Sequence, residues 1–266
     1  MPNYRQINRE VMLDTQRMYQ SLPELQEAIR SSVSRQYMVA HEDDISQPVV
    51  SDEQTQYICS GKRSFEAAAS YARNGKKVAV LNFANNHGIG GAPFSAGAQE
   101  ESLCRCSTLY PCLCAMRVPF YEKHIEQYTM HIIDEMGNDD LIYTPDVVVF
   151  KTDERTDPVY PKMMPQADWY KVDVITCAAP EMRYGVQKPN NYEQVIASRI
   201  KKILDVAAKE HAQAIILGAW GCGAFHNDSQ VVSSTFYSLL KNYNFEIVEF
   251  ALATHNDVSN SIFARH

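Results

Sequence analysis

The chain has 266 residues, a formal net charge of −7 and 45% hydrophobic residues. This hydrophobic share can form a substantial core, and the length suits one α/β unit with additions. The negative charge argues against general nucleic-acid binding through a basic surface, although backbone amides and helix N-termini can hold a diphosphate without any lysine.

The cysteine count and the lack of long apolar runs predict a reducing compartment. The chain has seven cysteines, an odd number, and the first ten residues are polar, unlike a signal peptide. We therefore expect a cytoplasmic protein, or a nuclear one in a eukaryote, that is not secreted and has no membrane partner. The CxC…CxC pattern from Cys104 to Cys114 is narrower than the CxxC spacing typical of structural zinc, so we expect no metal.

Residues 1–52 are expected to form a helical extension packed on the main domain, residues 53–266. Between residues 11 and 29 the apolar positions recur at helical spacing in two stretches, and Pro23 stands near the start of the second. The acidic stretch 41–48 follows and predicts a solvated loop.

A helix followed by a strand occurs twice in the main domain. Ser64–Arg73 predicts a helix with Ser64 as its N-cap, and the apolar run Val78–Phe83 predicts a buried strand. The same order recurs in the helix Tyr192–Lys209 and the strand Ala212–Leu217. Two such units predict a mixed or mostly parallel sheet with helices on both faces.

The remaining regular elements are expected in four stretches. Residues 141–150 predict two strands separated by a turn at Pro145-Asp146. Residues 172–176 and 245–252 predict further strands, and 229–240 predict a helix.

A glycine loop follows the strand that begins at Val78. Gly88, Gly90 and Gly91 allow positive φ and a close approach of another molecule to the main chain. The polar stretch 85–87 stands at the carboxyl end of the strand, where open α/β sheets bind ligands.

Gln99, Glu100 and Glu101 come after this loop and open a helix that we expect to continue to Leu109. Carboxylates are favoured in a first helical turn by the macrodipole, which is a purely structural explanation. Adjacent residues point in different directions, so the two acids are poorly placed to flank one bond as a catalytic pair. A better division is that one binds a sugar hydroxyl and the other transfers a proton.

With LNFA before the loop, Gln-Glu-Glu after it and then SLCRCSTLY, the segment resembles the signature of bacterial-type poly(ADP-ribose) glycohydrolases of the macrodomain-like family. That signature has three consecutive glycines, and here Ile89 occupies the first of those positions, before Gly90 and Gly91. The resemblance implies a macrodomain-like three-layer α/β/α fold with a mixed central sheet and N-terminal accessory helices.

A second glycine loop, GAWGCGAFHND at 218–228, stands between the strand at 212–217 and the helix at 229–240. Its free amides lie where a diphosphate could bind, and it is not a Walker loop because it lacks Gly-Lys-Ser/Thr. The loop resembles the macrodomain phosphate loop. That likeness implies that Phe225 borders the distal ribose and that Asn227 shapes its pocket.

The family resemblance implies hydrolysis of ribose–ribose O-glycosidic bonds in poly(ADP-ribose) with release of ADP-ribose. Glu101 would be the general acid and base, and Glu100 would bind hydroxyls of the ribose being cleaved. Either Asn85 or Asn86 would bind ribose as well. The implied substrate-binding residues are Gln99, Asn85, Asn86, Ile89, Gly90, Gly91, Gly218, Ala219, Gly221, Cys222, Gly223, Ala224, Phe225 and Asn227.

Two alternatives remain open at this point. Ile89 in place of a glycine suggests an ADP-ribose-binding macrodomain without hydrolase activity, whereas the intact Gln-Glu-Glu argues against it. A mono-ADP-ribosyl hydrolase would need the same pocket. We expect poly(ADP-ribose) or an ADP-ribosylated protein as partner, ADP-ribose as product, no cofactor, and a monomer.

Overall fold

A computed structural model describes residues 3–47, 55–153, 161–183, 186–253 and 257–264. The strands are β1 (Tyr37–Val39), β2 (Gln56–Ser60), β3 (Val78–Ala84), β4 (Leu141–Val149), β5 (Tyr170–Ala178), β6 (Ala214–Leu217) and β7 (Ile247–Ala251). The helices are α1 (Tyr4–Ser21), α2 (Pro23–Arg35), α3 (Ser64–Arg73), α4 (Gln99–Cys106), α5 (Leu109–Ala115), the π-helical segment η1 (Arg117–Glu122), α6 (Lys123–Thr129), the 3-10 turn η2 (Gln166–Asp168), α7 (Tyr192–Lys209), α8 (Ser229–Leu240) and α9 (Asp257–Phe263).

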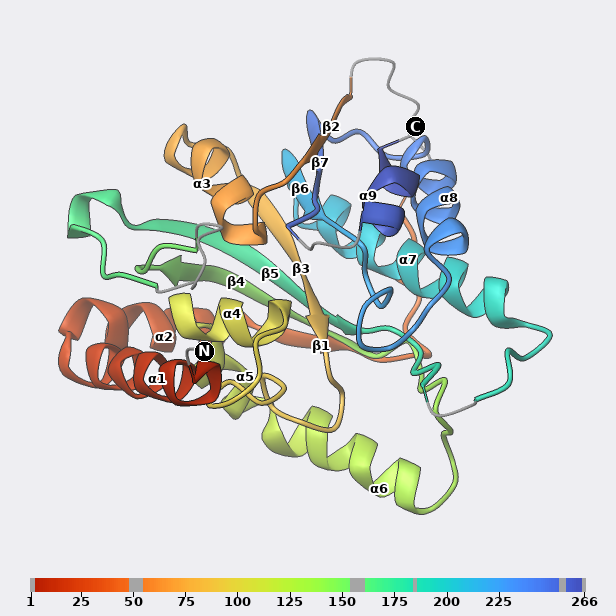
Figure 1. Cartoon of the computed structure of the whole chain (residues 1–266), viewed down its shortest axis with the longest axis horizontal. Coiled ribbons are helices and arrows are strands. Elements are labelled where there is room, and N and C mark those ends of the chain that lie inside the picture. Colours follow the sequence, from red (N-terminus) through yellow and green to blue (C-terminus); the bar gives the residue numbers. More distant parts are fainter. Residues whose placement is uncertain (1–2, 48–54, 154–160, 184–185, 254–256, 265–266) are drawn as a thin grey trace.

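The strands form one sheet in the order β1-β4-β5-β3-β6-β7-β2 (Figure 1). The pairs from β5 through β2 are parallel, whereas β4 runs antiparallel to β5 and β1 antiparallel to β4. The predicted mixed sheet is confirmed. Because β5, β3 and β6 are parallel neighbours, their carboxyl ends meet at one edge of the sheet, where both glycine loops begin.

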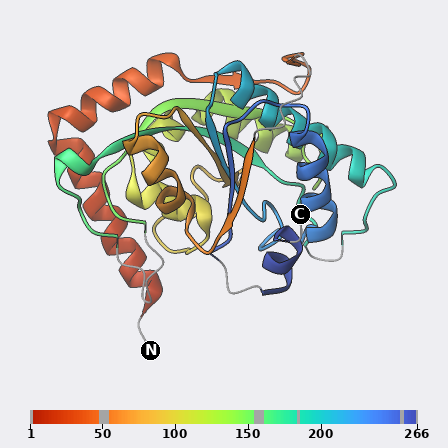
Figure 2. The ribbon, with the colours of Figure 1, turned by 90° about the horizontal axis from the view of Figure 1, so that it is seen from above.

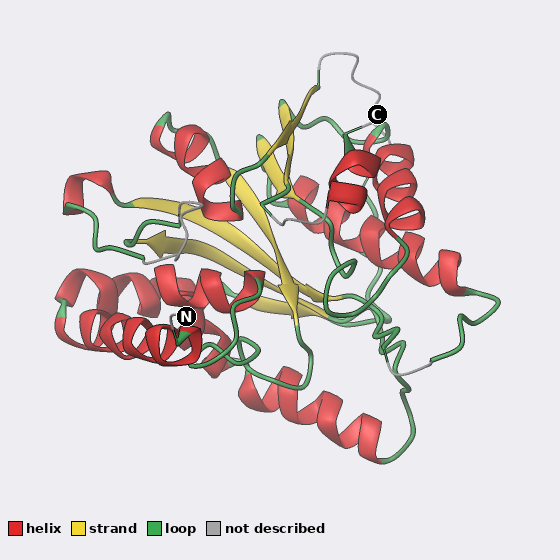
Figure 3. Ribbon diagram, viewed as in Figure 1, coloured by secondary structure: helices red, strands yellow, loops and turns green. Residues whose placement is uncertain are grey.

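Helices cover both faces of the sheet (Figure 3). On one face, apolar side chains of α7 and α8, such as Ile200 and Phe236, form a buried cluster with the strands. On the other face, Phe65 of α3, Leu103 of α4 and Leu113 of α5 form a second cluster. The predicted three-layer α/β/α fold is therefore confirmed.

The two predicted N-terminal helices are present and lie on the side of the molecule opposite α8 and α9 (Figure 2). In α1, the Thr15 hydroxyl donates to the carbonyl of Arg105 in α4 at 2.6 Å. The buried Lys151 ammonium lies 2.7 Å from Asp14. The proposed boundary at residues 52 and 53 lies outside the described residues, so the division into extension and catalytic domain stays a proposal.

Replacing Thr15 with Val is expected to lower the free energy of unfolding by about 1–2 kcal/mol, because the isosteric side chain leaves a buried carbonyl of α4 unpaired. Urea denaturation would measure the change. Thr129→Val is the matched control, since among the described residues the exposed Thr129 hydroxyl bonds only to the Ile125 carbonyl one turn earlier in its own helix. Equal effects of the two variants would argue against a special role for the α1–α4 bond.

Residues 141–149 form one strand, so the predicted break into two strands is wrong. The chain instead makes an irregularity between Thr144 and Val147 without leaving the sheet. Asp146 there has a φ of +52°, and its amide donates to the buried carboxylate of Asp173 at 3.0 Å. Because the Asp173 carboxylate accepts from the Asp146 amide, the irregular residue is not left unpaired, and the strand continues on both sides of it.

Two predicted helix boundaries also differ. The helix after Gln99 ends at Cys106, because Ser107 is extended (φ −147°) and forms a β-bridge with Val149; a new helix then begins at Leu109. Ser64 is the first residue of α3 rather than its cap.

Candidate active site

Gln99 fastens the start of α4 to the central strand β3. Its side-chain oxygen accepts from the amide of Phe83 at 2.9 Å, and its nitrogen donates to the Leu81 carbonyl at 2.8 Å and to the Ser64 hydroxyl at 3.0 Å. These bonds place the next two residues over the carboxyl end of the strand. The predicted contact of Gln99 with a ligand stays a prediction.

Glu100 is buried, with 3% of its surface exposed. Its Oε1 accepts from the Asn82 side chain at 3.2 Å, and its Oε2 accepts from the amide of Asn85 at 2.9 Å. Burial raises the pKa of Glu100 well above its ordinary value, and the neighbouring Glu101 adds to this, whereas the two hydrogen bonds oppose it.

Glu101 is held differently. Its Oε1 accepts from the amide of Ala92 at 3.0 Å. Its Oε2 is buried and has no hydrogen-bond partner among the described residues. A buried carboxylate oxygen without a partner is costly, so this atom is expected to have one when a ligand is bound.

The glycine loop passes directly over both carboxyl groups. Gly90 and Gly91 have φ values of +66° and +67°. A Cβ on Gly91 would overlap Oε1 of Glu101 and lie 3.2 Å from Oε2 of Glu100. Only glycine allows this approach.

Of the three glycines that allow positive φ, only Gly90 and Gly91 adopt it, and Gly88 does not. Ile89 does not have a positive φ either, and its side chain packs against the apolar cluster beneath α4. A β-branched residue therefore fits the first position of the loop without strain.

Asn85 shapes the loop through its side chain. Its Oδ1 accepts from the amides of His87 at 2.8 Å and Gly88 at 2.9 Å, an Asx-turn. Asn86 lies on the other side, where its side-chain nitrogen would be 3.2 Å from a Cβ on Gly137. The choice between Asn85 and Asn86 as a ribose ligand stays open.

The second half of the loop is tied to two helices. The buried guanidinium of Arg105 donates to the carbonyls of Pro93 at 2.9 Å and Ala96 at 2.8 Å. From α1, the Asn8 side chain donates to the carbonyls of Ser95 at 3.1 Å and Ala96 at 3.0 Å. The loop is thus fixed from α4 and from the N-terminal extension.

The second glycine loop follows β6, the parallel neighbour of β3. Asn227 is buried there; its side-chain nitrogen donates to the carbonyls of Pro180 at 2.7 Å and Gly221 at 3.1 Å, and its oxygen accepts from the Tyr192 hydroxyl at 3.0 Å. Gly221 has a φ of +71°, and a Cβ on it would overlap that of Ala179. Asn227 therefore shapes the loop by fixing it to Pro180, two residues after β5, and to α7.

Three consecutive amides of this loop are free. Within the described ranges, the amides of Gly223, Ala224 and Phe225 have no hydrogen-bond partner. The first amides of α8 are different, because the Asp228 side chain accepts from Gln230 and Val231. The loop rather than the helix end therefore offers donors to an anion.

The other predicted residues of the loop have structural contacts. A Cβ on Gly218 would lie 2.9 Å from the Phe83 ring, which brings the second loop against β3. Ala219 accepts from the amide of Cys222 at 3.1 Å, and burial raises the pKa of the Cys222 thiol to about 11. The guanidinium of Arg183 lies 5.2 Å from the centre of the Phe225 ring.

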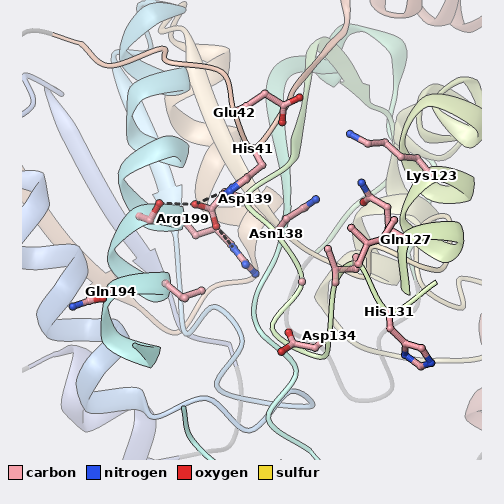
Figure 4. A pocket seen from close by; sticks show the side chains of 15 residues that line it. His41, Glu42, Lys123, Gln127, His131, Asp134, Asn138, Asp139, Gln194 and Arg199 are labelled. Carbon is pink, nitrogen blue, oxygen red and sulfur yellow. Dashed lines mark hydrogen bonds and ion pairs between the residues drawn. The ribbon is translucent and has the colours of Figure 1, made fainter. Parts of the chain in front are cut away.

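A cavity of about 740 Å³ lies beside this site, between α6 and α7 (Figure 4). Arg199 in its wall is bonded to Asp139 at 3.0 Å, and Lys123 lies 3.1 Å from Asp140. Glu100 and Glu101 do not line it. The cavity is therefore separate from the paired carboxyl groups.

Sequence reasoning missed three side chains of the site. Asn82 is a buried amide within an otherwise apolar strand, and that contrast was a usable signal. Tyr121 of η1 lies close to Glu100. Burial is the largest cause of the raised pKa of the Tyr121 phenol, and the Glu100 carboxylate is the second. Arg105 stands one turn after Glu101 on α4, and nothing in the sequence marks its contact with the loop.

The described residues contain no group of three or more His, Cys, Asp and Glu side chains that could hold a metal ion. Cys104, Cys106 and Cys112 are buried, and their burial raises the pKa of each thiol. No helix in the described part of the chain is long and apolar enough to span a membrane.

The mixed sheet between two helical layers, with both glycine loops at one edge, defines the macrodomain-like α/β class. The sequence matches the family model for the microbial-type PARG catalytic domain over residues 8–152, more than half of the chain. The chain belongs to this family, the microbial-type poly(ADP-ribose) glycohydrolases.

Solved structures agree with this assignment. Poly(ADP-ribose) glycohydrolase from Thermomonospora curvata is 27% identical, with a TM-score of 0.83 over 97% of this chain and 98% of that one. The same protein bound to the inhibitor ADP-HPD is 28% identical, with a TM-score of 0.80 over the same shares. The enzyme from Deinococcus radiodurans in complex with ADP-ribose is 27% identical, with a TM-score of 0.77 over 92% of this chain and 96% of that one. Comparison with curated proteins finds no match.

Proposed function

We propose that this chain hydrolyses ribose–ribose bonds of poly(ADP-ribose) with Glu101 as general acid and base. The observation that supports this role most directly is the buried Oε2 of Glu101, which lacks a partner in the described structure while Oε1 is held by the loop. In this mechanism Oε2 donates a proton to the departing ribose oxygen as the glycosidic bond breaks. Glu101 then removes a proton from the attacking water.

Glu100 binds hydroxyls of the ribose being cleaved. It is adjacent to Glu101 in sequence but is held from the strand side by Asn82 and Asn85. Its carboxyl group therefore cannot turn toward the same bond without losing both partners. This matches a division in which one carboxylate orients the sugar and the other transfers the proton.

The second glycine loop binds the diphosphate of the same unit. Its free amides at 223–225 are donors that can hold an anion without any lysine. The reaction passes through an oxocarbenium-like state. A diphosphate folded beneath the sugar would stabilise that positive charge, so a second catalytic carboxylate is not needed.

Gly221→Ala is expected to weaken ADP-ribose binding by at least about tenfold, because the new methyl group would meet Ala179 and lie 2.6 Å from the Asn227 amide nitrogen. Calorimetric titration with ADP-ribose measures the change. Gly75→Ala is the matched control, since Gly75 also has a positive φ (+81°), a Cβ there has nothing within 4 Å, and the residue lies outside this loop. If both variants bind like the parent chain, this loop is not the diphosphate site.

The function is tested by incubating the purified chain with labelled poly(ADP-ribose) and, separately, with a mono-ADP-ribosylated protein. Release of free ADP-ribose from the polymer supports the proposal. Release from the mono-ADP-ribosylated protein alone would make the chain a mono-ADP-ribosyl hydrolase. Binding of ADP-ribose with no release from either substrate would contradict the assigned chemistry.

Other expectations stay predictions. The monomeric state can be measured by size-exclusion chromatography with light scattering. The cytoplasmic location and the independence from any cofactor or metal can be measured by fractionation and by assay after treatment with a chelator.

A further inference from the structure

Asn82 occupies an unusual position in the central strand. It is fully buried between apolar residues of β3, where an amide is costly unless it is hydrogen-bonded. Its Nδ2 donates to Oε1 of Glu100 and to the hydroxyl of Thr176, each at 3.2 Å. Thr176 is its register partner on β5 and is also fully buried. The three side chains form a short chain of bonds that ends at the ribose-binding carboxyl group.

The other end of the Asn82 amide is unused. Its Oδ1 is buried and has no hydrogen-bond partner within the described residues. A planar amide that turns by 180° about its last bond exchanges the positions of nitrogen and oxygen. In that second arrangement Oδ1 would face Glu100 and the Thr176 hydroxyl. A hydroxyl can accept or donate, so Thr176 suits both arrangements.

We infer that Asn82 is a positioning residue that holds Glu100 against the ribose, and that it does so more strongly when this carboxyl group is ionised. An ionised Glu100 accepts from Nδ2, as observed; a neutral Glu100 can be held only after the amide turns and gives up the observed donor. The inference rests on the proposed function, in which Glu100 binds ribose hydroxyls. Asn82 does not itself touch the reacting atoms.

The surroundings of Glu100 make such a support useful. The ionisable groups close to it are Glu101 and Cys104 from α4 and Tyr121 from η1, and none of them is a cation. Burial therefore favours the neutral form, and the Asn82 and Asn85 donors favour the ionised form. Without Asn82, one oxygen of the ionised carboxyl group would be left without its donor.

The test is the pH dependence of kcat/KM for ADP-ribose release from poly(ADP-ribose). Asn82→Leu removes the donor at similar volume, and Asn82→Asp replaces the donor with a second acid. Both changes disfavour the ionised form of Glu100, so the acid limb of the profile is expected to move to higher pH by about one unit. Thr176→Val keeps the Asn82 amide and removes its anchor, and a smaller shift in the same direction is expected.

Ser233→Ala is the matched control, because Ser233 is fully buried in α8 on the opposite face of the sheet and has no partner among the described residues. Its acid limb should stay at the parent position. If Asn82→Leu fails to fold, Asn82→Asp and Thr176→Val give the same readout. A lower rate at every pH with an unmoved limb would overturn the inference and leave the proposed function intact. If the parent chain neither cleaves polymer nor binds ADP-ribose, the function and the inference both fail.

Discussion

Glu101→Gln is expected to lower kcat for ADP-ribose release by about 10²- to 10⁴-fold, the usual contribution of a general acid or base. The amide keeps the size of the carboxyl group and can still accept from Ala92, so the loop should keep its course. It cannot donate a proton to the departing oxygen. ADP-ribose affinity should change little, because the glutamine nitrogen at the position of Oε2 can still form a hydrogen bond with a ligand oxygen.

Two further variants make the result specific. Glu100→Gln is expected to raise KM as well as lower kcat, because Glu100 contacts the ribose hydroxyls in the bound substrate as well as in the transition state. Glu122→Gln changes an exposed glutamate of η1 and should match the parent chain. Single-turnover rates at saturating polymer separate these effects. A full rate for Glu101→Gln would exclude Glu101 as the acid.

The regular elements of the main domain could be predicted because their apolar periodicity is strong. Tyr192–Lys209 and Ser229–Leu240 are helices over the predicted ranges. The strand β4 was divided in error, because the sequence shows Pro145-Asp146 but cannot show that the distant carboxylate of Asp173 holds the irregular residue. The edge strand β1 has only three residues and becomes a strand by pairing with β4.

The site was predictable as far as its local pattern reaches. Glu100 and Glu101 were found because a glycine loop and a helix start stand on either side of them. Their different surroundings depend on contacts across the fold: Asn82 on β3 reaches Glu100, while Ala92 in the loop reaches Glu101. A sequence read in order gives no distance between such residues, so it could not say which carboxyl oxygen remains free.

The same limit explains Gln99 and Asn227. Both were predicted as substrate-binding residues, yet the structure gives their side-chain amides partners within the protein, at β3 for Gln99 and at Pro180 and α7 for Asn227. Buried amides that hold main-chain groups fix the course of a loop. Before these bonds are known, an amide beside a binding site is equally compatible with binding the substrate and with holding the loop.

Gly91→Ala is expected to lower kcat by about 10²-fold or more, the cost of a misplacement of about 1 Å at a reacting group. The methyl group would overlap Oε1 of Glu101 and lie 3.2 Å from Oε2 of Glu100, so both carboxyl groups or the loop must move. Alanine at a φ of +67° adds a backbone cost of about 1–2 kcal/mol. The measurements are kcat on polymer and the free energy of unfolding in urea.

Gly75→Ala separates the two causes. Gly75 has a φ of +81°, and a Cβ there would have nothing within 4 Å, so this variant has the backbone strain without the overlap. It should lose about 1–2 kcal/mol of stability and keep its kcat. Gly90→Ala would press on the Cys104 sulfur at 2.8 Å instead of on a carboxyl group and should lose more stability than Gly75→Ala. If Gly91→Ala loses no more activity than Gly75→Ala, the glycine is required for the turn alone and not for the approach of the loop to the catalytic carboxyl groups.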